Sequence, residues 1–417
     1  MTELRALRRR LHAYPETGFT EIVTAATVIG ELRAAGIEPC YGEQVCVVEG
    51  LAGLPDPAEL AAARERAAVQ GVAPELIDTL SGGRTGILAE VHGNRPGPVL
   101  GIRFDMDALP VTEAGEAAHF PAAEGFASTR EGVMHACGHD GHTAIGVELG
   151  SRLAADPDFP GTVRLLFQPA EEGVRGARAL VEAGACTGIG TILALHLGLG
   201  LEVGTVAAAA RGMLATVKLR VRLTGRAAHA ALAPNEGRNA LLAATHAANA
   251  LHAMPPIPGI ATRVNVGTLR AGTAANIVPE HAELGMELRA ETTAACAELI
   301  ERARAILEGA AHMHGVELEI AETGKATAAV HDEAVCAGIT AAAQATAGVR
   351  ECLAEAPMSA SDDATLLLDA VREQGGTGAY FLVGAANPAP HHHGRFDIDE
   401  RSLPIAVELL ERFVRAR

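Results

Sequence analysis

The stretch VLGIRFDMD, from Val99 to Asp107, is a short apolar run that ends on two carboxylates. Similar short runs recur at residues 86–91, 163–167, 192–195 and 379–383. Helical patterns lie between them, at residues 143–153 and 176–183. Strands that alternate with helices predict an α/β fold, with a mostly parallel sheet and helices on both of its faces.

Polar motifs come after four of these runs. In chain order, the motif residues are Asp105 and Asp107, then Glu171 and Glu172, then His196, and last His392. In open α/β sheets, ligands bind outside the carboxyl ends of the strands. The sequence therefore predicts that these side chains converge on one site.

The middle of the chain has another pattern, because apolar and polar residues alternate at residues 217–223. Strands are predicted there and at 264–269, 284–288 and 316–320, and helices at 239–254 and 296–313. The order β-α-β-β-α-β is that of the ferredoxin-like split unit. A chain of 417 residues is long enough for two domains. We predict a discontinuous first domain of residues 1–211 and 324–417, which carries the polar motifs, and an inserted α+β domain of residues 212–323.

The charge and the cysteines exclude several classes of protein. A formal net charge of −17 argues against nucleic-acid binding, which needs a basic face. No stretch approaches the roughly 18 apolar residues of a membrane span, and the N-terminal residues show no secretory signal. The seven cysteines are scattered, which fits a reducing cytosol, although Cys40 and Cys46 are close enough to pair. We expect a cytoplasmic protein that binds neither nucleic acid nor a membrane.

The segment HACGHDGH, residues 135–142, holds a thiol close to several imidazoles. Cys137 and His139 are too near each other to line one face of a helix, so they suit an irregular turn before a helix that starts near His142. A thiolate is a soft ligand that could bridge two metal ions. A cysteine alone is more often a small buried residue, but with His139 beside it Cys137 is predicted to bind metal.

Glu171 and Glu172 form a second candidate pair of site residues. Adjacent carboxylates can divide the work, with one on the metal and the other free as a base with a raised pKa. The alternative interpretation is that Glu171 and Glu172 are solvated loop residues without a role in a site. His196 and one of the three histidines 391–393 are further candidate ligands, with a core histidine as the alternative for His196. Asp107 could orient a ligand imidazole or cap the next turn.

These motifs resemble those of a family of co-catalytic metallopeptidases. They are FDMDALP (104–110), HACGHDGH, FQPAEEG (167–173), ALH (194–196), GRAAHAALAP (225–234) and NIVP (276–279). The chain is similar to the superfamily of carboxypeptidase G, the aminoacylases and the plant auxin-conjugate amidohydrolases, and the cysteine favours the auxin-conjugate branch over carboxypeptidase G. It is more similar still to the A-type subunits of the aminobenzoyl-glutamate hydrolases. That likeness extends to the 41–82 insertion with its GLPD, the RVNVG run and the tail HHxxxFDIDE.

The resemblance implies a role for each motif residue. Two divalent ions per subunit, Mn²⁺ or Zn²⁺, would share Cys137. His139 and His196 would complete the ligands of one ion, and Glu172 and His392 those of the other. His392 is chosen from three histidines because it stands four residues before Phe396, as the family ligand does. The other implied roles are Glu171 as general base, Asp107 as the carboxylate that orients a ligand, His229 as an oxyanion donor from a neighbouring subunit, and Asn276 and Arg289 as substrate-binding residues.

The implied activity is hydrolysis of the amide bond of N-acyl amino acids, with p-aminobenzoyl-glutamate-like substrates favoured. A general or auxin-conjugate-type amidohydrolase is the alternative, and a non-catalytic metal-binding subunit is the rival from another class. The inserted domain would act as a lid and dimerisation domain in a homodimer, or in a heterodimer with a related B-type subunit. One departure concerns specificity, because Ala360-Ser361-Asp362-Asp363 stands where the family has Gly-Ser-Glu-Asp.

Overall fold

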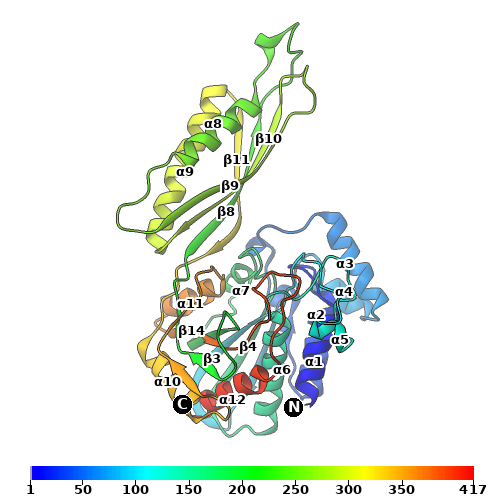
Figure 1. The fold of residues 1–417 in the computed structure, drawn as a ribbon, viewed down its shortest axis with the longest axis vertical. Coiled ribbons are helices and arrows are strands. Elements are labelled where there is room, and N and C mark those ends of the chain that lie inside the picture. Colours follow the sequence, from blue (N-terminus) through cyan, green and yellow to red (C-terminus); the bar gives the residue numbers. More distant parts are fainter. Residues whose placement is uncertain (1) are drawn as a thin grey trace. The chain divides into compact units, whose positions relative to one another are not determined.

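A sheet of eight strands organises the first of two units, in the order β1-β2-β4-β3-β5-β14-β6-β12 (Figure 1). The computed structural model describes residues 2–417, without the side chains of Thr2 and Val48. The central strands run parallel: β4 (Pro160–Gln168), β3 (Arg95–Asp105), β5 (Ile189–Leu197) and β14 (Thr377–Val383). The predicted mostly parallel sheet is confirmed.

Shorter strands flank this parallel centre. On one side β2 (Ile87–His92) is antiparallel to β4, and β1 (Cys40–Tyr41) is antiparallel to β2. On the other side β6 (Thr205–Ala207) is antiparallel to β14 and parallel to β12 (Glu351–Leu353). A separate parallel pair consists of β7 (Ala210–Arg211) and β13 (Ala356–Pro357).

Helices cover both faces of the large sheet. One group shares an apolar core with Leu193 and Leu195 of β5: α1 (Thr2–Ala13), α2 (Ile22–Ala34), α6 (His139–Ala155), α10 (Glu333–Ala345) and α12 (Ser402–Arg415). Successive side chains of a strand point to opposite faces. Ile192 accordingly lies on the other side, where it and Leu368 of α11 (Ala364–Glu373) adjoin Gly378. Helix α7 (Ala177–Glu182) packs against α11, and α5 (Phe120–Ala123) is a short outer turn.

Helix α6 approaches the sheet closely at Gly146. A Cβ atom there would lie 2.6 Å from the ring of Phe104, whose centroid is 5.6 Å from that of Phe167. Glycine is therefore required for the helix to lie against these two strands. The contact sets the first turn of α6 beside the ends of β3 and β4, where the candidate ligands are.

The second unit, Gly212–Ala328, has a sheet and a core of its own. Its elements are β8 (Ala215–Thr224), α8 (Ala240–His252), β9 (Thr262–Ala271), β10 (His281–Ala290), α9 (Thr293–His314) and β11 (Glu317–Ala326). The strands are antiparallel in the order β11-β8-β10-β9, as in the ferredoxin-like unit. The predicted boundary at residue 324 falls inside β11, because the strand continues past its irregular register near Gly324.

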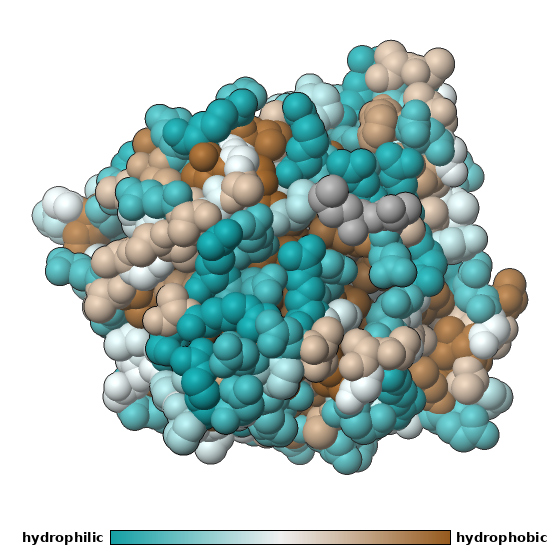
Figure 2. All heavy atoms as spheres, turned by 90° about the horizontal axis from the view of Figure 1, so that it is seen from below, coloured by the Kyte–Doolittle hydropathy of each residue, from teal (hydrophilic) through white to brown (hydrophobic). Residues whose placement is uncertain are grey.

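The 41–82 insertion forms two helices in the first unit. After the short 3-10 turns 42–44 and 48–50, α3 (Pro57–Val69) and α4 (Pro74–Leu80) follow, each with proline in its first turn. Helix α3 is only partly exposed, since it buries Ala63 and Ala67. Among the helices of residues 2–417, none is long and apolar enough to cross a bilayer. The face of the molecule in Figure 2 is mostly hydrophilic, with narrow apolar areas between polar side chains.

Candidate metal centre

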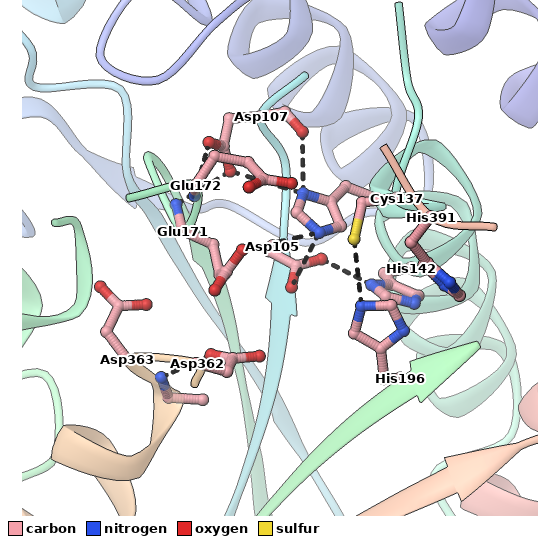
Figure 3. A network of polar contacts seen from close by, with 12 residues as sticks. Asp105, Asp107, Cys137, His142, Glu171, Glu172, His196, Asp362, Asp363 and His391 are labelled. Carbon is pink, nitrogen blue, oxygen red and sulfur yellow. Dashed lines mark hydrogen bonds and ion pairs between the residues drawn. The ribbon is translucent and has the colours of Figure 1, made fainter. Parts of the chain in front are cut away.

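The predicted ligands converge at the carboxyl ends of the parallel strands, and Figure 3 shows three of them, Cys137, Glu172 and His196. Asp107 follows β3, the Glu171-Glu172 pair lies in the turn after β4, and His196 is the second-last residue of β5. His392 comes from the segment after β14. Cys137 and His139 stand at the start of α6, so elements far apart in the sequence meet at one site.

Gly138 arranges the first turn of α6. It has φ 90°, in the left-handed region, and it caps the helix, which begins at His139. The prediction that this helix starts near His142, with His139 in an irregular turn, was wrong. A positive φ at glycine costs little, so the chain can bend at Gly138, and the ligand atoms of Cys137 and His139 lie within 4.8 Å of each other.

The hydrogen bonds of His139 and His196 leave one nitrogen of each ring free for a metal. Nδ1 of His139 donates to the backbone oxygen of Asp107 at 2.8 Å, and Nδ1 of His196 donates to that of Leu197 at 2.9 Å. In each ring Nε2 then carries the lone pair. Nε2 of His196 lies 3.4 Å from Sγ of Cys137, and the buried Nε2 of His139 has no hydrogen-bond partner.

The structure distinguishes His392 from the two other histidines of its run. Its Nε2 lies 3.3 Å from Oε1 of Glu172. His391 instead approaches the backbone oxygen of Leu197, and His393 accepts from the backbone N–H of Arg395. Hydrogen bonds with Cys137 and Glu172 raise the pKa of His392 to about 10. The thiol and the carboxylate thus stabilise positive charge between them, which suits a cation site.

Two groups of three ligand atoms share Cys137. One group is Cys137, His139 and His196, and the other is Cys137, Glu172 and His392. Within each group the ligand atoms lie within 4.8 Å of one another. Thiolate, imidazole and carboxylate together are a donor set for zinc or another transition metal. The residues present therefore fit two neighbouring divalent ions with a shared thiolate.

Glu171 lies beside these groups in a more enclosed environment. Its carboxylate is 3.9 Å from Nε2 of His139, and the residue is 8% exposed. Burial, followed by the charges of Asp362 and Glu172, raises the pKa of Glu171 well above its usual value. A carboxylate with a raised pKa is suited to accept a proton.

Asp107 joins three of the predicted site residues. Its two carboxylate oxygens accept from the backbone N–H groups of Glu171 and Glu172, at 2.9 and 3.0 Å. Its backbone oxygen accepts from His139. Asp107 therefore fixes the turn that carries the glutamates and the ring that faces the cysteine.

Sequence reasoning missed a buried network under the site. Arg103 donates to Asp105 at 2.5 Å and to Asp362 at 3.0 Å. Asp105 also accepts from Nδ1 of His142, whose Nε2 accepts from the backbone N–H of Leu197, so both nitrogens of that ring are engaged. An arginine between Ile102 and Phe104, inside an apolar run, was the signal that could have indicated this network. Asp362, part of the departure from Gly-Ser-Glu-Asp, is thereby held against Arg103.

The remaining predicted residues lie in the second unit. His229 and Asn276 are neighbours, because the backbone N–H of Ala230 donates to the oxygen of Asn276 and His229 forms a β-bridge with Ile277. Both side chains are exposed. Arg289 is near the other end of β10, where it pairs with Glu287. The three residues are therefore not brought together within this unit.

Comparison with known proteins gives a consistent group of relatives. The model of peptidase family M20/M25/M40 matches residues 101–416. The chain is 42% identical to the A-type subunit of the p-aminobenzoyl-glutamate hydrolase of Escherichia coli, over 97% of this chain and 93% of that one. It is also 42% identical to indole-3-acetyl-aspartic acid hydrolase of Enterobacter agglomerans, over 98% and 94%.

Two solved structures show the same fold. The aminobenzoyl-glutamate utilization protein of Klebsiella pneumoniae superposes with a TM-score of 0.86 at 36% identity, over all of this chain and 95% of that one. The YXEP protein of Bacillus subtilis, described as a dinuclear metal binding peptidase, superposes with a TM-score of 0.68 at 26% identity, over 100% and 97%.

Proposed function

The chain belongs to peptidase family M20/M25/M40, and from that premise we propose how its residues carry out amide hydrolysis. It is a metal-dependent amidohydrolase of N-acyl amino acids. The observation that carries the proposal is that Cys137 belongs to two groups of three ligand atoms, with Glu171 beside them. Cys137 would be shared by two divalent ions, with His139 and His196 on one and Glu172 and His392 on the other.

The ions, when bound, lower the pKa of water and polarise the substrate carbonyl. Glu171 takes the proton of the attacking water and returns it to the leaving amine. Its raised pKa, caused first by burial, makes it a stronger base than an ordinary glutamate. Asp107 holds the backbone of both glutamates in place, so the base and the ligand keep separate positions.

His229 is proposed to stabilise the oxyanion from a neighbouring copy of the chain. It lies beside Asn276, before the start of β10 at His281, whereas Arg289 is near the end of that strand. Eight residues of antiparallel strand span roughly 27 Å. One inserted unit therefore cannot place Asn276 and Arg289 on the same small substrate. If both bind it, they come from different copies, with His229 and Asn276 from one copy and Arg289 from the other.

The proposed substrate is an aromatic acyl group joined to an acidic amino acid. The two relatives at 42% identity are named for p-aminobenzoyl-glutamate and for indole-3-acetyl-aspartic acid, which share that chemistry. The proposed ions are Mn²⁺ or Zn²⁺. The proposed assembly is a homodimer, or a heterodimer with a related B-type subunit, since the name of the Escherichia coli relative describes one subunit of its enzyme. We place the enzyme in the cytoplasm.

The test is a substrate panel with the purified protein, freed of metal and reloaded with Mn²⁺ or Zn²⁺. Hydrolysis of p-aminobenzoyl-glutamate, indole-3-acetyl-aspartate and N-acetyl-glutamate is measured by release of the free amine. We expect the two aromatic substrates to have the higher kcat/KM. Absence of hydrolysis of all three with either metal, by a correctly folded protein, would contradict the proposed function.

A further inference from the structure

Arg175 connects the turn of the two glutamates to the 41–82 insertion. Its Nε donates to the backbone oxygen of Glu172 at 2.9 Å, and its Nη1 donates to the backbone oxygen of Gly53 at 2.8 Å. The guanidinium also lies over the ring of Phe19, 5.3 Å from its centroid. One side chain thus contacts the metal-binding turn and the GLPD segment, Gly53–Asp56, at once.

The guanidinium of Arg175 is occupied by these contacts. Among the described residues it forms no ion pair with a carboxylate, and its hydrogen bonds go to backbone oxygens. Its remaining nitrogen, Nη2, packs against Gly18, where a Cβ atom would lie 2.5 Å from it. Because all three nitrogens of the guanidinium have contacts within the protein, we interpret Arg175 as a clamp between two segments and not as a binding group for a substrate carboxylate.

The turn that Arg175 clamps has an unusual backbone. Ala170 and Val174 have φ of 49° and 58°, in the left-handed region that non-glycine residues rarely adopt. They stand on either side of the two glutamates. The backbone N–H of Ala170 donates to Glu21, and that of Arg175 donates to the oxygen of Ala170. Contacts such as these are needed to hold a strained turn in one conformation.

The insertion packs against the segment that follows this turn. At Gly50 a Cβ atom would lie 2.5 Å from Cα of Ala179 in α7. At Gly83 a Cβ atom would lie 2.6 Å from Cδ2 of Leu54 and 3.4 Å from the side chain of Phe19. Leu54 and Phe19, whose ring lies under Arg175, therefore both adjoin Gly83, and Leu54 is still 37% exposed.

We propose that residues 51–54, clamped by Arg175, form a wall of the acyl pocket and select aromatic over small acyl groups. This inference rests on the proposed function and adds the residues that determine its specificity. Leu51 and Ala52 are half-buried and Leu54 is exposed, and Arg175 ties the backbone of Gly53, between them, to that of Glu172. An apolar wall stabilises a ring but gains nothing from an acetyl group, which is too small to cover it. Arg175 is a positioning residue, because it acts through Gly53 and Glu172.

Leu54→Ala tests the wall with two substrates that share one leaving group, N-benzoyl-glutamate and N-acetyl-glutamate. We expect KM for the benzoyl substrate to rise about tenfold, as for the loss of a few methylene contacts, with kcat, metal content and KM for the acetyl substrate unchanged. Val69→Ala is the matched control, since Val69 is an 84% exposed apolar residue of the same insertion. It should leave both substrates unaffected.

Arg175→Met and Arg175→Lys test the clamp without relying on activity. In the metal-free protein, hydrogen exchange of the backbone amides of residues 50–56 should be faster in Arg175→Met than in the wild type, and closer to the wild-type rate in Arg175→Lys, which keeps one charged donor nitrogen. Equal exchange in all three proteins overturns the clamp. A wild-type enzyme that hydrolyses both substrates, while Leu54→Ala changes their KM values equally, overturns the wall alone. A wild-type protein that hydrolyses neither contradicts the proposed function and, with it, the specificity role.

Discussion

Glu171 and Glu172 are adjacent in sequence but differ in what surrounds them. Glu172 faces His392 and Cys137, whereas Glu171 is enclosed near Asp362. Both backbone N–H groups are held by Asp107, so neither side chain can easily take the place of the other. The proposed difference in role between Glu171 and Glu172 therefore follows from the turn that carries them, because their side chains have the same chemistry.

Replacing each glutamate by glutamine separates the two roles. Glu171→Gln should lower kcat by about 10²–10⁴-fold, the range for a lost general base, and keep its metal. Glu172→Gln should lose metal as well as activity, because an amide is a poorer ligand than a carboxylate. Metal content, measured by elemental analysis, and kcat, measured on the same samples, show which glutamate acts as the base and which as the ligand. The reverse pattern would mean that the two roles are exchanged.

At the scale of single residues, the sequence predicts which residue types form the site, but it does not predict which residues surround them. Cysteine, histidine and paired glutamates that follow several apolar runs of one chain together indicate metal chemistry. The contact between Arg103 and Asp362 joins residues 259 positions apart. No local pattern reveals such a pairing. The choice of His392 over its neighbours came instead from the resemblance, through its spacing from Phe396, and in the structure Nε2 of His392 lies 3.3 Å from Glu172.

At the scale of elements, α1 and α6 meet through buried charges as well as apolar side chains. The leucines at residues 4, 7 and 11 recur at helical spacing along α1, and they are buried. Arg8 and His12, one turn apart on the same helix, are also buried and bind Asp140 of α6. Arg8 reaches Asp397 near the C-terminus as well. Charged residues beside an apolar stripe are usually solvent-exposed, so this contact was not predicted.

Arg8→Met should lower the free energy of unfolding by about 3–5 kcal/mol, because Asp140 and Asp397 would remain buried with one partner fewer. Urea unfolding, followed by circular dichroism, measures the change. Arg33→Met is the control, since Arg33 forms an exposed ion pair with Glu38 and should contribute little. A loss for Arg8→Met no larger than that of the control would contradict the assigned role.

The same cluster makes stability depend on pH with a defined sign. Although burial opposes it, the charges of Arg8 and His12 hold the pKa of Asp140 below its usual range. The stability that Asp140 contributes is therefore present above its unfolded pKa, about 3.9, and is lost as the pH falls below it. The pKa of His12 is raised by Asp140 and Glu113 against burial and Arg8, so its contribution is present below about pH 6.5 and is lost at higher pH. Asp140→Asn should flatten the acid side of a plot of unfolding midpoint against pH; an unchanged slope would contradict this.

At the scale of the whole molecule, the two units carry different parts of the proposed site. The proposed metal ligands all lie in the first unit, and His229, Asn276 and Arg289 lie in the second. The β-α-β-β-α-β order of the second unit was predictable because each element has a clear apolar period. The boundary at residue 324 was not, because β11 continues through Gly324 with an irregular register.

Mixed dimers test whether His229 acts across subunits. His229→Ala and Glu171→Gln should each be inactive, with metal content retained. When the two are mixed and allowed to exchange subunits, each hybrid should contain one site with an intact Glu171 and an intact His229, and activity should return. The activity of the mixture is compared with that of each variant alone. No recovery, with exchange confirmed by mass spectrometry of the intact dimer, would place His229 in its own chain's site or outside catalysis.

The most direct test of the central claim is a metal titration of the metal-free protein. Activity toward p-aminobenzoyl-glutamate and bound Mn²⁺ or Zn²⁺ are measured as metal is added in steps. If two ions share Cys137, activity and the amount of bound metal should both level off at two equivalents of metal per chain. The variant Cys137→Ser should bind both equivalents more weakly. A plateau at one equivalent, full activity without metal, or a Cys137→Ser variant with normal metal binding would contradict the account.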